Sequence, residues 1–131
     1  MKIEKDNDKE VYVGIGFHLG VEAVEIENAI YAFLEELEIE LKEVKGLCTA
    51  DFRKTEQLQE VSYEFGIPLF LFSRDEINSV DVRSKSAATE ALNIKGVAEP
   101  CAILGAKMNK DEFKFVKRKS FDRKITLAVV F

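Results

Sequence analysis

The chain has 131 residues, of which 47% are hydrophobic and 33% charged, and these values are typical of a single globular domain spanning residues 1–131. A formal net charge of −5 argues against general nucleic-acid binding, which needs a basic surface. No apolar run reaches the ~18 residues of a membrane span. The segment 1–10 is charged, is expected to fray and lacks the apolar region of a signal peptide. A cytoplasmic protein without membrane contact is therefore expected.

The first regular element is a strand over 11–17, rich in β-branched and aromatic residues. It runs into a glycine turn that contains Gly14, Gly16 and Gly20, and an amphipathic helix over 21–38 follows. Glycine lets a ligand approach the main chain closely, and the free N–H groups that begin a helix favour an anion. His18, the only histidine, lies inside this turn. The sequence therefore predicts an anion-binding turn here.

The spacing of the glycines leaves two other interpretations open. Gly-x-Gly-x-x-x-Gly is one residue longer than the dinucleotide fingerprint, and no acidic residue ends a second strand at the required distance. No Gly-Lys-Ser/Thr follows, so the turn is no P-loop. A nucleotide-binding domain and a tight connection without any ligand remain as alternatives.

The rest of the chain alternates between strand and helix before it ends in a hairpin. Ser73 and Glu76 have the spacing of a capping box at the start of a short helix. Strands are expected at 44–50, 69–72, 113–117 and 125–130, and helices at 56–65, 74–80, 86–92 and 97–106. This order predicts an α/β fold of three layers, α/β/α, with a mixed, mostly parallel sheet of about five strands and an antiparallel C-terminal hairpin.

Ligands of such sheets bind beyond the carboxyl ends of the strands. Three loops should meet there, namely 14–20, 49–54 and 73–76. The cationic or titratable side chains expected near this edge are His18, Lys54, Arg74, Arg83, Lys117 and Lys119. Cys48 and Cys101 are interpreted as reduced, packed thiols, and without a Cys/His cluster the sequence predicts neither a metal site nor a cofactor.

The same loops carry a resemblance to a known family. The chain resembles, over about 11–131, the C-terminal domain of the cobalamin biosynthesis protein CbiG and its stand-alone relative CobE. The similarity depends on the order and spacing of several short motifs, which are Val13-Gly14-Ile15-Gly16 with Gly20, Thr49-Ala50-Asp51-x-x-Lys54, Phe65-Gly66-Ile67-Pro68-Leu69, Phe72-Ser73-x-x-Glu76, Gly96-Val97-Ala98-Glu99-x-Cys101-Ala102, and Lys119 with Ile125-Thr126-Leu127-Ala128-Val129.

The resemblance implies a role in vitamin B12 biosynthesis. CbiG-like proteins are cobalt-precorrin-5A hydrolases, which open a lactone on the macrocycle and release acetaldehyde. Candidate bases for the attacking water are His18, Asp51 and Glu99, although a turn residue, a cap and a first-turn acid are the plain structural interpretations of these three. Candidate substrate-binding residues, for a ligand with several carboxylates, are Gly14, Gly16, Gly20, Thr49, Lys54, Ser73 and Lys119.

An alternative function within the same family is a CobE-like module, which binds or delivers a corrinoid precursor without catalysis. Two features favour this alternative. Phe17 and His18 stand where the family usually has cysteine and arginine, and the resemblance covers only the C-terminal domain of full-length CbiG. A separately encoded CbiG N-terminal domain is therefore an expected partner, beside the corrinoid intermediate itself.

Overall fold

The computed structural model describes residues 9–52, 56–80, 97–109 and 112–131. Its strands are β1 (Val11–Phe17), β2 (Val44–Ala50), β3 (Leu69–Phe72), β4 (Phe115–Phe121) and β5 (Ile125–Val130). Its helices are α2 (Ala23–Leu37), the 3-10 turn η1 (Leu41–Glu43), α3 (Glu56–Phe65), α4 (Arg74–Asn78) and α6 (Ala98–Asn109). The predicted helix 86–92 lies outside the described residues, as do Lys54 and Arg83.

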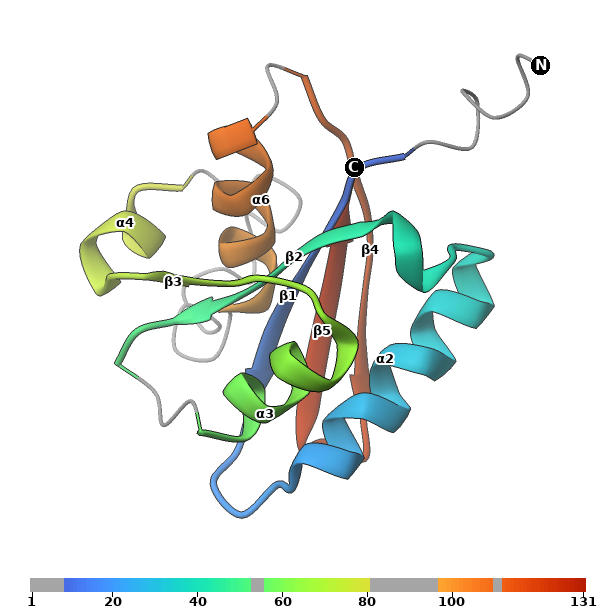
Figure 1. The fold of residues 1–131 in the computed structure, drawn as a ribbon. Helices are drawn as coiled ribbons and strands as arrows, with labels where there is room; N and C mark the ends of the chain where they lie inside the picture. Colours follow the sequence, from blue (N-terminus) through green and yellow to red (C-terminus); the bar gives the residue numbers. More distant parts are fainter. Residues whose placement is uncertain (1–8, 53–55, 81–96, 110–111) are drawn as a thin grey trace, which may run out of the picture.

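The five strands form one mixed sheet in the order β3-β2-β1-β5-β4 (Figure 1). Strands β1, β2 and β3 are parallel, whereas β5 is antiparallel to both of its neighbours, β1 and β4. The predicted α/β class, the mixed sheet and the antiparallel C-terminal hairpin are confirmed. No helix among the described residues is long and apolar enough to cross a membrane.

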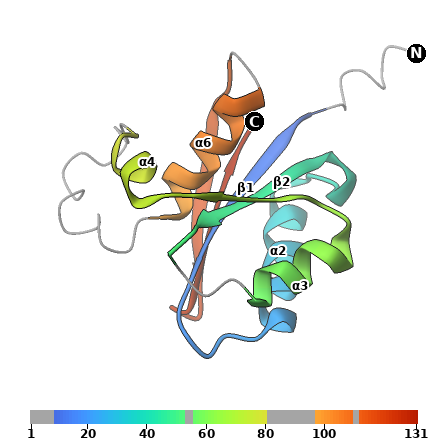
Figure 2. The same cartoon turned by 60° about the vertical axis from the view of Figure 1, so that its left-hand side comes forward.

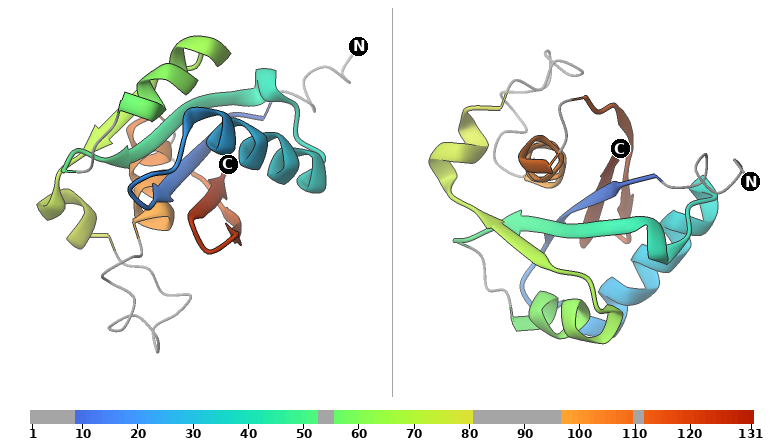
Figure 3. Two further views of the ribbon diagram at one scale, coloured as in Figure 1. Left: turned by 90° about the horizontal axis from the view of Figure 1, so that it is seen from below. Right: turned by 45° about the horizontal axis from the view of Figure 1, so that its top comes forward.

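Helices cover both faces of this sheet (Figures 2 and 3). The right-handed crossovers from β1 to β2 and from β2 to β3 move in one direction along the sheet, so α2 and α3 lie on the same face. The chain then returns to the other side of β1, which leaves α6, with α4 beside it, on the opposite face. The side chains of β1 alternate accordingly: Val11, Val13 and Ile15 belong to the core under α2, and Tyr12 to the core under α6.

Helix α6 packs unusually close to β1 because two glycines of that strand have no side chain. A Cβ at Gly14 would clash with the main chain of α6, since it would lie 2.8 Å from the carbonyl carbon of Ala98 and 2.9 Å from the nitrogen of Ala102. A Cβ at Gly16 would lie 3.0 Å from Cγ2 of Val97. Both glycines are paired residues of β1 rather than part of the turn, so the loop after this strand is shorter than the predicted 14–20.

The last hairpin is displaced from its predicted position. Strand β4 occupies 115–121 rather than 113–117. Asp122 and Arg123 both have left-handed backbone conformations, with φ of 53° and 59°, and the Lys124 N–H donates to the Phe121 carbonyl oxygen at 2.9 Å. These are the features of a type I′ turn, whose signal is weak here because neither central residue is glycine. The chain therefore reverses later than the sequence pattern suggested.

Gly66 ends α3 in a left-handed conformation with φ of 69°, and its N–H donates to the Ser62 carbonyl oxygen at 2.9 Å. We expect Gly66→Ala to lower the free energy of unfolding by about 1 kcal/mol, because a Cβ is disfavoured in this backbone conformation. Urea denaturation measures the change. Glu60→Ala, at an exposed position inside the same helix, is the control and should leave the midpoint almost unchanged.

Candidate functional site

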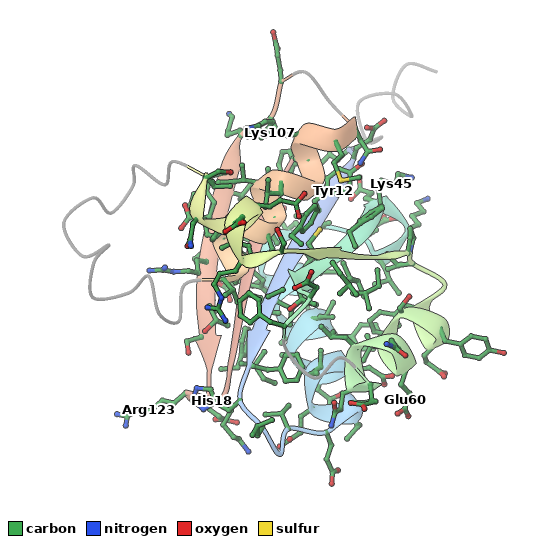
Figure 4. All side chains as sticks on the ribbon, turned by 90° about the vertical axis from the view of Figure 1, so that its left-hand side faces the viewer. Tyr12, His18, Lys45, Glu60, Lys107 and Arg123 are labelled. Atoms are coloured by element: carbon green, nitrogen blue, oxygen red, sulfur yellow. The ribbon has the colours of Figure 1, made fainter. Side chains whose placement is uncertain are left out.

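The carboxyl ends of the parallel strands do not all meet at one point. The sheet is strongly twisted, and β1 ends away from β2 and β3 (Figures 1 and 2). His18, just beyond β1, is exposed and lies beside the β4–β5 turn (Figure 4). Its main-chain N–H donates to the Lys124 carbonyl oxygen at 3.0 Å. Gly20, with φ of 93°, completes this loop. The structure therefore separates His18 and Gly20 from the residues that follow β2 and β3.

The loops after β2 and β3 are joined to each other. The N–H of Asp51 donates to the Phe72 carbonyl oxygen at 2.8 Å, so Asp51 lies next to the start of α4. The predicted capping box is present there: the Glu76 N–H donates to Oγ of Ser73 at 3.1 Å, and the Ser73 N–H donates to Oε1 of Glu76 at 2.8 Å. Of the predicted site residues, Asp51 and Ser73 are thus brought together, and Asp51 is an exposed residue.

A buried thiol lies close to these carboxylates. Cys101, on the first turns of α6, is fully buried, and burial together with the charges of Asp51 and Glu76 raises the pKa of its thiol to about 12. The pKa of the Cys48 thiol is raised as well, chiefly by burial. Neither thiol is ionised near neutral pH, and a thiol is a poor nucleophile. Covalent catalysis by cysteine is therefore disfavoured, and a water attacking with the help of a carboxylate fits this site better.

Phe52 was not singled out from the sequence. The residue is 40% exposed, and the guanidinium carbon of Arg74 lies 4.1 Å from the centroid of its ring. Phe52 follows β2 and Arg74 follows β3, so the stack bridges the same two loops as Asp51 and Ser73. The available signal was an aromatic residue in an otherwise polar loop, beside a strand end that carries arginine. The two loops thus carry an aromatic residue, a guanidinium and, directly before Phe52, the acidic residue Asp51.

Glu99 lies in the first turn of α6, as predicted, but its side chain is only 6% exposed. One of its oxygens is 4.0 Å from a guanidinium nitrogen of Arg118, a residue of β4 that the sequence analysis did not name. The positive end of the helix dipole favours a carboxylate in this position. Glu99 is therefore a buried carboxylate held beside a half-exposed arginine, on the face of the sheet that α6 covers.

Three other predicted site residues lie within regular structure. Thr49 is fully buried in β2, where its hydroxyl donates to the Ile15 carbonyl oxygen at 2.7 Å and joins β2 to β1. Gly14 and Gly16 face α6, and close helix packing accounts for glycine at both positions without a ligand.

Lys119 lies on the opposite face of the sheet from α6. Its ammonium nitrogen is 2.6 Å from one carboxylate oxygen of Glu36, and that of Lys117 is 2.7 Å from the other, so the two lysines of β4 hold one glutamate of α2. Hydrogen bonds from Lys117 and Lys119 lower the pKa of Glu36 from its ordinary value of 4.5 to about 2. The predicted substrate-binding residue Lys119 thus connects α2 to the sheet in this structure.

The charge of Glu36 should stabilise the fold only where this carboxylate is ionised. Because its folded pKa is lowered, the contribution is complete above about pH 4.5, the unfolded pKa, and is lost as the pH falls towards about 2. We therefore expect Glu36→Gln to lower the urea midpoint at pH 7, and to have the same midpoint as the wild type near pH 2. Glu35→Gln, at a neighbouring exposed position, should show no such pH-dependent difference.

An open groove of about 700 Å³ lies at the amino ends of β2 and β3, whereas the site described above lies at the carboxyl ends of the same strands. Its lining is mostly apolar, and Lys42 and Lys45 are the charged residues among those that form it. These lining residues include no carboxylate, hydroxyl or imidazole that could act on a substrate. Parallel sheets bind ligands at the carboxyl ends of their strands, so we place the candidate site there and not in this groove.

In the part of the chain that the structure describes, no group of three or more histidine, cysteine and acidic residues is arranged to hold a metal ion.

The family comparison agrees with the fold: the family model described as "Cobalamin synthesis G C-terminus", CbiG_C, matches residues 11–130. The chain belongs to the CbiG C-terminal family. Its match spans every strand and helix of the described structure, from β1 to β5.

Two curated relatives of this CbiG C-terminal domain are longer proteins. It is 34% identical over 124 residues to "Cobalt-precorrin-5A hydrolase" of Priestia megaterium, covering 93% of this chain and 33% of the relative. It is 29% identical over 129 residues to "Probable cobalt-precorrin-5A hydrolase" of Methanocaldococcus jannaschii, covering 92% of this chain and 40% of the relative. The chain therefore spans a third to two fifths of the length of these two relatives.

Solved structures of cobalamin biosynthesis proteins share the fold of the CbiG C-terminal domain. CobE is 21% identical, with a TM-score of 0.79 over 92% of this chain and 88% of CobE. A homolog of cobalamin biosynthesis protein G from Sulfolobus solfataricus is 25% identical, with a TM-score of 0.73 over 93% of this chain and 36% of the homolog. The arrangement of sheet and helices is thus found both in a chain of similar size and within a longer protein.

Proposed function

We propose that this chain binds a corrinoid precursor of vitamin B12 and takes part in opening its lactone, as a cobalt-precorrin-5A hydrolase-type domain. The observation that carries the proposal is its 34% identity, over nearly its whole length, to a protein of that name. The local chemistry is compatible with this substrate class. A corrinoid precursor has a broad ring with peripheral carboxylates, and the loops after β2 and β3 offer an exposed aromatic ring, a guanidinium and a carboxylate.

Asp51 is the base that we propose for the attacking water. Asp51 is exposed, directly follows β2 and immediately precedes Phe52, the aromatic partner of the Phe52–Arg74 stack. In lactone hydrolysis, the carboxylate takes one proton as the water oxygen attacks the carbonyl carbon. The ring carbon–oxygen bond then breaks, and the leaving alkoxide takes the proton back from Asp51 and becomes a hydroxyl group. The new carboxylic acid releases the second proton of the water to solvent and becomes a carboxylate. Glu99 and His18 remain further candidate bases; Glu99 is buried, and His18 lies at a different part of the sheet edge.

A corrinoid-binding module without catalysis is the second candidate function. The hydroxyl groups of Thr49 and Ser73 are both engaged with the main chain, in contacts that hold strands together or cap α4. Within the described residues, the site therefore offers contacts for a ring and a carboxylate more clearly than it offers a donor for a developing oxyanion. The separately encoded N-terminal portion that we propose as a partner could supply such a group.

The two functions can be separated with one substrate. The chain is incubated with the lactone intermediate, alone and together with the N-terminal portion of a longer relative, and acetaldehyde release is measured beside the visible absorbance of the macrocycle. Ring opening supports the hydrolase proposal. An absorbance change and a raised Tm without acetaldehyde in either mixture support the binding module. No binding and no turnover in either mixture would overturn both.

A further inference from the structure

We propose that the Phe52 ring and the Arg74 guanidinium together form the surface on which the corrinoid macrocycle lies, with Arg74 binding one of its peripheral carboxylates. This inference rests on the proposed function and names the residues that would contact the ligand. The supporting geometry is that of the stack: the guanidinium carbon lies 4.1 Å from the centroid of the Phe52 ring, and Phe52 as a residue is still 40% exposed.

The two loops that carry this pair are anchored by hydrogen bonds of the residues directly before each partner. Asp51, the residue before Phe52, donates its N–H to Phe72 at the end of β3. Ser73, the residue before Arg74, is held by both hydrogen bonds of the capping box. Each partner of the stack therefore follows a residue that is anchored to the sheet or to α4. A surface that is ordered before the ligand arrives loses less conformational entropy on binding.

The chemistry of the stack defines the ligand that it fits. A guanidinium over an aromatic face keeps its N–H groups directed outward in the plane, where they can bind a carboxylate with two parallel hydrogen bonds. The ion pairs found among the described residues are made by other cations, on η1, on β4 and in the β4–β5 turn. The exposed part of the Phe52 ring offers an apolar contact for a flat conjugated system. The combination fits a broad ring that carries acidic side chains.

The test uses two probes with the same ring. One is a cobalt corrin whose peripheral side chains are free carboxylates, and the other is that corrin with these side chains amidated. Titrations followed by visible absorbance give the dissociation constants. Arg74→Gln should weaken binding of the carboxylate probe by about tenfold and leave the amidated probe almost unaffected, because only the carboxylate makes a charge-assisted hydrogen bond. Phe52→Leu should weaken both probes by about tenfold, because it removes the aromatic contact.

Two control variants lie outside this surface. Tyr63→Leu removes an aromatic ring that is 88% exposed on α3, and Arg123→Gln removes a cation in the β4–β5 turn; both should bind like the wild type. Phe52→Tyr keeps the aromatic face and should also bind like the wild type. If Phe52 had a purely structural role, Phe52→Leu would show a lowered Tm with unchanged affinity for both probes.

The outcomes separate the inference from the proposed function. If the wild-type chain binds the probes and both Arg74→Gln and Phe52→Leu bind them equally well, the macrocycle lies elsewhere and the inference is wrong, while the proposed function stands. If the wild-type chain binds neither probe nor the lactone intermediate, the proposed function fails and the inference fails with it. Loss of binding by Arg74→Gln for both probes to the same extent would contradict the assigned role in carboxylate recognition.

Discussion

Gly14→Ala is expected to lower the free energy of unfolding by about 3 kcal/mol or more, at the upper end of what overpacking costs. The added Cβ would meet the carbonyl group of Ala98 and the nitrogen of Ala102, so the obstacle is the main chain of α6 rather than a movable side chain. Either α6 moves away from β1, or the strand bends. Urea denaturation should show a lower midpoint, and Tm should fall by roughly 10 °C or more for a domain of this size.

Gly16→Ala is the matched control, two residues further along the same strand. The nearest atom to its new Cβ would be Cγ2 of Val97, at 3.0 Å, with the next neighbour at 3.9 Å. A side chain can give way by a few tenths of an ångström, so we expect a loss of about 1 kcal/mol or less. If the two variants are equally stable, the close approach of α6 to Gly14 is not the reason for glycine at that position.

Asp51→Asn is expected to reduce the rate of lactone opening by about 100-fold or more while leaving corrinoid affinity nearly unchanged. The amide keeps the shape of the side chain but cannot accept the proton of the attacking water, and a positioned general base typically contributes 10²–10⁴-fold. The measurement is single-turnover acetaldehyde release, with the dissociation constant taken from the absorbance titration. Since Asp51 is exposed, its replacement should change Tm very little.

Asp122→Asn is the control for this experiment, because it makes the same substitution in the exposed β4–β5 turn. It should leave both rate and affinity at the wild-type level. Full activity of Asp51→Asn would exclude Asp51 as the base, and parallel measurements on Glu99→Gln and His18→Ala would then show whether one of the other two candidates fills the role.

The strands and helices were largely predictable because their signals are local. The capping box of Ser73 and Glu76, the C-terminal Gly66 of α3 and the alternation of β1 each depend on neighbours within a few residues. The position of β4 was predicted less well, since Asp122 and Arg123 adopt left-handed conformations and the turn has no glycine to mark it in the sequence.

The candidate site was less predictable because it depends on contacts between distant segments. Glycine in a strand indicates close approach, but the sequence does not say whether a ligand or a helix approaches, and at Gly14 the neighbour is α6. The faces of the C-terminal hairpin depend on the register of β4, which directs Lys119 to Glu36 and Arg118 to Glu99. The stack of Phe52 on Arg74 exists only because β2 and β3 are neighbours in the sheet.

The order of the strands also determines how the molecule resists self-association. The two edges are β3 and β4, and an edge strand presents unpaired N–H and C=O groups that can pair with another copy. Strand β4 carries three consecutive charged residues, 117–119, and charged side chains on an edge strand disfavour pairing with a second molecule even though these three also form ion pairs within the domain. Strand β3 has no charged residue, and Leu71 is 43% exposed, but the strand is only four residues long and follows Pro68, which lacks a donor. Aggregation is therefore resisted by charged side chains at one edge, and at the other by the short length of β3 and the proline before it.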